Sequence, residues 1–196
     1  MSSILYVKSS ILGEHSASSA VVDALHAHWV QKHAGASHVV RDLGASALPH
    51  LDMATLGAMR SESAEAQAGA VTGLKVLQEL LDADTLVLAA PMYNFGIPST
   101  LKAWLDHVIH PGKTFQYGAN GPEGLLKGKK AVLVLSTGGA YTEGPAKSMD
   151  FVEPYLRAVL GFIGITDATV VRAEAQAMGE AGVASKAKAV AAVRAL

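Results

Sequence analysis

The sequence has no cysteine among its 196 residues. This absence excludes disulfides, zinc–thiolate sites and thiol redox chemistry, so any electron transfer has to use a bound cofactor. Charged residues make up only 17% of the chain, and the formal net charge of −1 offers no basic surface to nucleic acid or to an anionic membrane. No apolar run approaches the length of a bilayer-spanning helix. We therefore expect neither a nucleic-acid partner nor a membrane partner.

Motifs of several well-known active sites are missing as well. The dinucleotide fingerprint Gly-x-Gly-x-x-Gly does not follow the first expected strand, and the run most similar to a Walker loop, 128–130, precedes a strand. The Gly-x-Ser-x-Gly elbow of serine hydrolases is absent. Near His107 and His110, no carboxylate stands at a spacing that completes a metal site, so we expect no metal.

Half of the residues are hydrophobic, and they are distributed in short runs. Apolar runs that indicate buried strands lie at 4–7, 39–43, 86–90, 131–135 and 169–171. Apolar residues at helical spacing lie between or after them, at 21–29, 62–82, 101–110, 151–163 and 180–196. This alternation predicts an α/β fold with an open, five-stranded parallel sheet, in one domain over residues 1–196. The chain enters its first strand without the segments of a signal peptide, so we expect a cytoplasmic protein.

The segment from Pro91 to Lys102 is the first place where we expect a site. It joins a buried strand to a helix, at the carboxyl edge where open α/β sheets bind ligands. Its prolines stiffen both ends, and Gly96 allows close approach, so the segment suits a flat heteroaromatic ligand that needs stacking and hydrogen bonds. The alternative is an ordinary connection with buried aromatics. Ser99 or Thr100 is expected to cap the helix that follows.

Two further strand-end loops carry small and polar residues. The serine-rich loop 8–19 precedes a helix, whose first N–H groups lack intrahelical partners and favour an anion. Ser16 and Ser18 can donate to a phosphate there, or one of them merely caps the helix. In the loop 136–141, the paired Gly138 and Gly139 let a ligand touch the backbone. A phosphate pocket beside aromatic and glycine-bearing loops is what a flavin mononucleotide needs.

Two segments near the end of the chain bear on the substrate and on assembly. The segment 111–130 shows no periodicity, and a loop of that length is usually functional. We expect its aromatic residues either over the site or packed on the edge of the domain. The helix 151–163 has two adjacent apolar rows, more than one sheet face requires, which predicts a homodimer. The alternative is that 111–130 covers that surface within the same chain.

At this point the chain resembles a known family, the FMN-dependent NADH:azoreductases, also described as FMN-dependent NADH:quinone oxidoreductases. The resemblance rests on Pro91-Met92-Tyr93-Asn94-Phe95-Gly96-Ile97-Pro98, on the loops 8–12 and 16–18, on Ser136-Thr137-Gly138-Gly139, and on matches at 115–125 and 160–165. It implies a flavodoxin-like, three-layer homodimer. Such a protein passes electrons from NADH or NADPH through FMN to quinones and azo compounds by a ping-pong mechanism. The alternative is a flavodoxin-like electron carrier, although such carriers tend to be strongly acidic.

Carried over by position, the resemblance assigns no catalytic side chain, because the flavin carries the chemistry. The cofactor-binding residues that it implies are Ser10, Ser16, Ala17, Ser18, Met92, Tyr93, Asn94, Phe95, Ser136, Thr137, Gly138 and Gly139. The substrate-binding residues that it implies are Phe115, Tyr117, Asn120 and Phe162. Ala17 departs from the family pattern, which often has a polar residue there, so only its backbone N–H can serve.

Overall fold

The computed structural model describes residues 2–196. A five-stranded sheet has the strand order β2-β1-β3-β6-β7, and every neighbouring pair in it is parallel. Its strands are β1 (Ser3–Lys8), β2 (Ser37–Asp42), β3 (Thr85–Pro91), β6 (Lys130–Ser136) and β7 (Asp167–Ala173). The helices are α1 (Ala17–Lys32), α2 (Met53–Arg60), α3 (Ala64–Gln67), α4 (Val71–Asp82), α5 (Ser99–Val108), α6 (Glu153–Phe162) and α7 (Glu180–Val193). The predicted α/β class and five-stranded parallel sheet are therefore confirmed.

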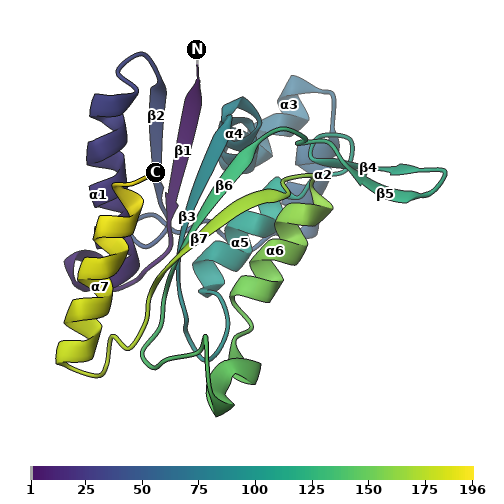
Figure 1. Cartoon of the computed structure of the whole chain (residues 1–196). Coiled ribbons are helices and arrows are strands. Elements are labelled where there is room, and N and C mark those ends of the chain that lie inside the picture. The colour runs from purple at the N-terminus through teal and green to yellow at the C-terminus, as the bar shows by residue number, and fades with distance from the viewer. Residues whose placement is uncertain (1) are drawn as a thin grey trace.

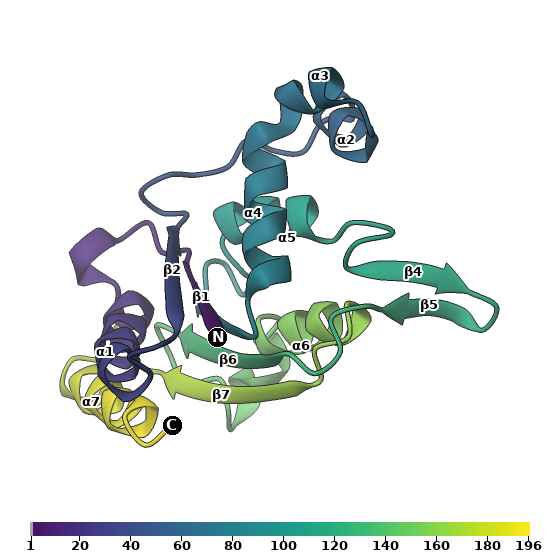
Figure 2. The same cartoon turned by 90° about the horizontal axis from the view of Figure 1, so that it is seen from above.

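The central strands are buried on both faces, because successive side chains point into two different cores. In β1, Leu5 and Val7 face the core formed with α4, α5 and α6, whereas Ile4 and Tyr6 face the core formed with α1 and α7. Figures 1 and 2 show these two helical layers on opposite sides of the sheet. A sheet covered on both sides explains the short, continuous apolar runs of the sequence.

The strand order places a topological switch between β1 and β3. From β1 the chain moves outward to β2, and from β3 it moves to β6 on the other side, so the connections diverge and leave a crevice at the carboxyl edge. The loops after β1, β3 and β6 meet at this edge, which is the lower end of the sheet in Figure 1.

The segment 111–130 contains a β-hairpin, which the sequence analysis did not predict. β4 (Phe115–Gly118) pairs antiparallel with β5 (Gly121–Gly124), and the hairpin extends away from the main sheet (Figure 2). The strands are too short and too polar to show an alternating apolar pattern. The hairpin crosses the end of α6 at a close contact between backbones: a Cβ placed on Gly124 would lie 2.1 Å from the amide nitrogen of Gly164.

Two helix predictions were wrong in detail. The helix expected over 62–82 is interrupted between α3 and α4, because Ala70 leaves helical dihedral angles and packs against Met59 and Leu77. Neither Ser99 nor Thr100 caps α5, since the helix begins at Ser99 and Pro98 occupies the cap position. The Thr100 hydroxyl instead donates to the backbone oxygen of Ser9, 3.2 Å away, and so ties the loop after β3 to the loop after β1.

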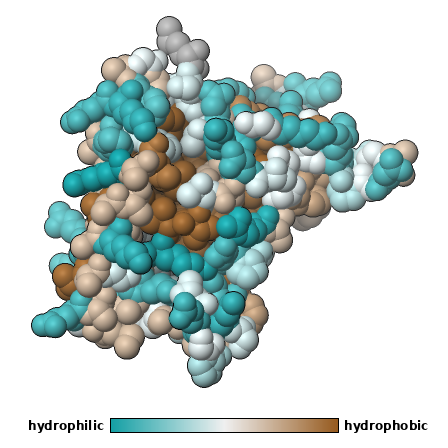
Figure 3. All heavy atoms as spheres, in the orientation of Figure 1, coloured by the Kyte–Doolittle hydropathy of each residue, from teal (hydrophilic) through white to brown (hydrophobic). Residues whose placement is uncertain are grey.

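The layer formed by α1 and α7 leaves part of its sheet face uncovered. Figure 3 shows apolar side chains on this face between those helices and α6. A hollow of about 400 Å³ lies there, with Ile4, Trp29 and Val132 in its lining. Within residues 2–196, no helix is both long enough and apolar enough to cross a membrane.

Candidate cofactor site

The loop after β1 ends in a helix start that is rich in hydrogen-bond donors. Ser16 stands at the N-cap of α1, and its Oγ accepts from the amide of Ser19 at 3.1 Å, so the capping role is confirmed for this serine. The Ser18 Oγ lies 3.3 Å from that of Ser16, and both residues are buried. Within residues 2–196, the amides of Ala17 and Ser18 have no acceptor. Two free amides beside two hydroxyls at a helix N-terminus are suited to binding an anion.

The loops after β1 and β3 are joined by Tyr93. Its hydroxyl lies 3.1 Å from the Oγ of Ser10 and accepts from the amide of Ile11 at 3.2 Å. The Ser9 hydroxyl donates to the backbone oxygen of Ala89, 2.7 Å away, which fixes the same two strands to each other just before their loops. Ser10 and Tyr93, more than eighty residues apart in the chain, therefore lie side by side.

The loop after β3 contains a tight turn with an unusual backbone. Tyr93 and Gly96 exchange two hydrogen bonds, and the residues between them have positive φ, 49° for Asn94 and 70° for Phe95. Positive φ at both central residues defines a type I′ turn. Asparagine tolerates that conformation, whereas phenylalanine rarely adopts it and stores backbone strain. The turn leaves the Phe95 ring 40% exposed, and both central amides lack an acceptor in the described chain.

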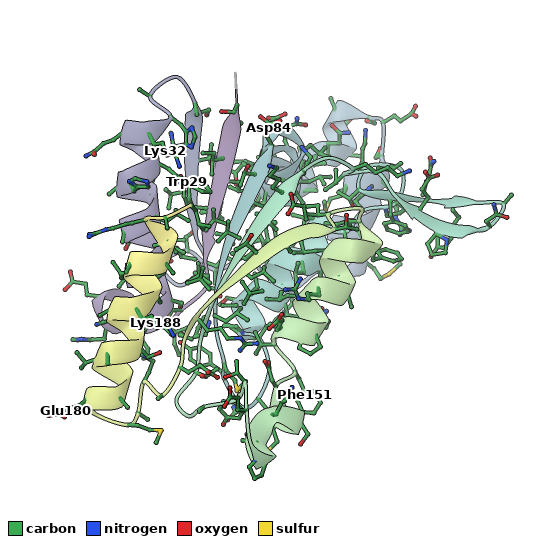
Figure 4. The ribbon with its side chains drawn as sticks, viewed as in Figure 1. Trp29, Lys32, Asp84, Phe151, Glu180 and Lys188 are labelled. Atoms are coloured by element: carbon green, nitrogen blue, oxygen red, sulfur yellow. The ribbon has the colours of Figure 1, made fainter. Side chains whose placement is uncertain are left out.

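Phe95 is held in this strained conformation by two other segments. Its carbonyl accepts from the amide of Phe151 at 3.3 Å, and its ring meets that of Tyr141 edge to face, with centroids 6.4 Å apart. Phe151 lies two residues before α6, at the carboxyl edge of the sheet (Figure 4).

In the loop after β6, the carbonyl groups are hydrogen-bonded within the described chain, whereas several amide groups are not. The carbonyl oxygens of residues 137, 138 and 139 all accept from the segment 175–177, at 2.9–3.0 Å. The amides of Gly138, Gly139 and Ala140 have no acceptor in residues 2–196. The Met92 amide donates to the Ser136 oxygen at 2.7 Å, which links this loop to the loop after β3. The loop thus presents N–H groups, and no carbonyls of 137–139, to a ligand.

The structure brings all twelve predicted cofactor residues to one edge of the sheet, on these three loops. They supply backbone amides, hydroxyls and aromatic rings, but no carboxylate and no cationic side chain. Such a donor set fits an anionic phosphate attached to a planar ring system. A cavity of about 1020 Å³ exists elsewhere, with α4, Arg60 and His110 in its lining, and contains none of the twelve. In the described residues, no group of three or more His, Asp or Glu is placed to hold a metal ion.

Comparisons with known proteins agree with this geometry. Residues 2–196 match a family model described as flavodoxin-like fold. The FMN-dependent NADH:quinone oxidoreductase of Herminiimonas arsenicoxydans is 46% identical over 187 residues, which is 93% of this chain and 92% of the relative. That of Beijerinckia indica is 49% identical over 178 residues, covering 89% and 88%. The chain belongs to this family.

Solved structures give the same result for the fold. An azoreductase from Bacillus anthracis superposes with a TM-score of 0.86 at 27% identity, over 100% of both chains. An FMN-dependent NADH-azoreductase of the same species, solved in complex with FMN, gives a TM-score of 0.85 at 25% identity, over 100% of this chain and 97% of that one. The flavodoxin-like fold and the family resemblance predicted from the sequence are confirmed.

The four residues that the resemblance assigns to the substrate of this oxidoreductase family lie elsewhere in the chain. The Phe115 ring contacts the rings of Phe162 and Tyr117, with centroids 4.7 and 5.6 Å apart. Phe162 ends α6, about 15 Å along the helix from its start near Phe95. Asn120 lies in the turn of the hairpin, and Tyr117 is 77% exposed. One chain therefore does not bring these four to the cofactor loops, and Phe115 packs on the domain edge.

Sequence reasoning missed residues that build the site from β7. Glu174 directly follows this strand, Gln176 comes two residues later, and both contact the backbone of neighbouring segments. The rule that ligand sites lie at carboxyl ends of strands applies to β7 as well, and it would have singled out Glu174.

Proposed function

We propose that this protein binds FMN and transfers electrons from NADH or NADPH to quinones and aromatic azo compounds. One observation carries the proposal: three strand-end loops present unpaired amides, hydroxyls and rings at one edge of the sheet, and none of the twelve residues assigned to the cofactor has an ionic side chain. The family relatives, which are named for FMN, NADH and quinone, support it.

Each loop has its own part in holding the cofactor. Ser10, Ser16, Ala17 and Ser18 would bind the phosphate through hydroxyls and the free amides of the α1 start. The segment 92–95 would contact the ribityl chain and one side of the ring, and 136–139 the ring's other edge. When bound, FMN supplies the hydride and electron chemistry.

The protein's contribution to the reaction is electrostatic and steric. The amides of Gly138, Gly139 and Ala140 are fixed before the ligand arrives, because the carbonyls of 137–139 are already paired. Preorganised donors of this kind stabilise negative charge without having to reorient during the reaction. Phe95 and Tyr141, whose rings meet edge to face, would shield the same edge from water once the cofactor is bound. We propose that the nicotinamide and the acceptor use one open face in turn, so the first leaves before the second enters.

We also propose a homodimer, in which a second copy completes the site. Phe151, two residues before α6, is 61% exposed, and Phe162 at the end of α6 is 37% exposed. A hollow of about 400 Å³ beside the helix is lined by Phe151, Tyr155 and Ile97 among others, and is almost wholly apolar. The hairpin contacts the far end of α6 through Phe115 and Phe162, and none of its residues lines this hollow. A second copy that covers it can bring its own Phe162 and Tyr117 toward the flavin. A cytoplasmic location and a single domain over 1–196 belong to the same proposal.

An anaerobic titration tests the function. The purified protein, loaded with FMN, should lose its visible flavin absorbance on addition of NADH and regain it on addition of a quinone. Steady-state rates should then give parallel double-reciprocal lines, since both substrates share one face. A bound flavin that NADH does not reduce would indicate an electron carrier instead, and intersecting lines would rule out the alternating use of one face.

A further inference from the structure

We propose that Glu174 is a positioning residue of the cofactor site, a role that rests on the proposed FMN function. Its Oε1 accepts from the amides of Tyr141 and Thr142, at 2.6 and 3.0 Å, and its Oε2 accepts from the Thr142 hydroxyl at 2.6 Å. Glu174 directly follows β7, whereas Tyr141 and Thr142 belong to the loop after β6. The carboxylate therefore fastens one strand-end loop from the neighbouring strand.

This contact completes the fixation of the loop from both sides. The segment 175–177 pairs with the carbonyls of 137–139, and Glu174 pairs with the amides of 141 and 142. The amides left between these two sets are those of Gly138, Gly139 and Ala140, which are the donors proposed for the flavin ring. Glu174 thus determines where the row of free donors ends.

The backbone directly after Glu174 is itself strained. Ala175 has a φ of 60°, a left-handed conformation that a residue with a side chain adopts at a cost. This turn aims the amides of 175–177 at the loop after β6, and the Ala175 amide donates to the Gly139 oxygen at 3.0 Å. A strained backbone conformation persists only when the surrounding structure holds it. The three hydrogen bonds accepted by Glu174 hold the chain directly before Ala175.

The influence of Glu174 extends to the loop after β3 through Tyr141. The Tyr141 ring lies against Gly139, where an added Cβ would be 3.4 Å from Cε2, and it also meets the Phe95 ring edge to face. Glu174 holds the backbone of the residue that braces the strained turn at Asn94 and Phe95. None of the ion pairs in residues 2–196 includes Glu174, so its charge is balanced by these N–H and O–H donors.

Glu174→Ala is the variant that removes the contact. We expect its FMN dissociation constant to rise at least tenfold, measured by quenching of flavin fluorescence with apoprotein. At saturating FMN, the midpoint potential of the bound flavin should become more negative, and the acceptor KM should rise more than kcat falls. Glu174→Gln should restore most of the affinity, because Oε1 can still accept both amides and Nε2 can donate to the Thr142 hydroxyl.

Glu143→Ala is the matched control, because it removes the same charge from an exposed residue of the same loop and should leave all of these values unchanged. If Glu174→Ala lowers the Tm but leaves the FMN affinity and the midpoint potential unchanged, Glu174 only stabilises the fold, and the proposal is overturned. If the parent protein does not bind FMN, the proposed function fails and this role fails with it. The two failures are therefore distinguishable.

Discussion

Ser16 has a double role at the scale of single residues. One lone pair of its Oγ caps α1, yet the neighbouring amides and one hydroxyl proton of the Ser16–Ser18 pair stay available for an anion. The capping interpretation and the phosphate interpretation of this loop are therefore compatible. A substitution that distinguishes the two roles of Ser16 has to keep the helix cap and prevent binding of the phosphate.

We predict that Ser16→Ala combined with Ser18→Ala weakens FMN binding roughly a hundredfold or more, because a hydrogen bond to a charged group contributes about 1.5–3 kcal/mol. Titration of the apoprotein with FMN measures this. Loss of the cap also lowers stability by about 0.5–2 kcal/mol. Ser16→Asp is the sharper test, since aspartate keeps the cap but repels a phosphate: its Tm should stay near that of the parent while FMN binding is lost. Tight FMN binding by Ser16→Asp would refute the phosphate assignment.

A second residue-scale prediction concerns His26. Burial lowers the pKa of its ring, and the neighbouring His38 and Lys8 lower it further, although Asp23 acts in the opposite direction. Because the folded state binds this proton less readily than the unfolded state, the free energy of unfolding should fall as pH drops below about 6.5. Burial lowers the pKa of His110 in the same direction.

Urea unfolding of the apoprotein at pH 5.5 and 7.5 measures the effect. His26→Gln should reduce the difference in stability between the two pH values, and the exposed His50→Gln serves as the control. An unchanged pH dependence in His26→Gln would exclude this histidine as a source.

At the scale of elements, the hairpin depends on the meeting of Gly124 and Gly164. A side chain at Gly124 would overlap the backbone of Gly164, which itself has a φ of 98°. We predict that Gly124→Ala forces the hairpin off the end of α6 and destabilises the protein by about 1–3 kcal/mol, as overpacking typically does. Gly118→Ala in the same hairpin is the control, because its Cβ would meet only an ordinary contact at 3.7 Å. Equal thermal stability of the two variants would contradict this account.

The elements differ in how far the sequence predicts them. The strands and the long helices follow from apolar runs and helical spacing, since burial determines both. The hairpin strand Gly121–Gly124 has no apolar side chain to reveal it, and a backbone contact between two glycines positions it. The three site loops were predictable as strand ends. The direction of their amides was not, because it depends on the turn at Ala175 and on the long-range contact of Glu174.

At the scale of the whole molecule, the exposed apolar side chains on α6 and just before it predict the assembly. Sedimentation equilibrium at micromolar concentration should give twice the chain mass of 20.3 kDa. Phe151→Asp should shift the protein toward the monomer and lower turnover, because each site would lose its partner's residues. Met53→Asp, which places the same charge on another exposed apolar residue, should not.

Phe162→Ala tests the substrate role separately, and it should change the acceptor KM more than the FMN affinity. A mass near 20.3 kDa for the parent would refute the dimer. Unchanged acceptor kinetics in Phe162→Ala would place that ring in the packing of the hairpin alone.

The loop after β6, with its paired carbonyls and free amides, has a consequence for how this protein can evolve and how its site can be tested. The amides of Gly138, Gly139 and Ala140 belong to the main chain, so every residue type except proline carries the same donor. Substitution of Gly138 or Gly139 by alanine would leave that row of donors intact and would reveal little about ligand binding. Substitution by proline, or replacement of one amide by an ester, deletes a single donor and keeps its neighbours. In this loop, main-chain amides would recognise the ligand. The sequence specifies their positions only indirectly, through the segment after β7 that pairs with the loop.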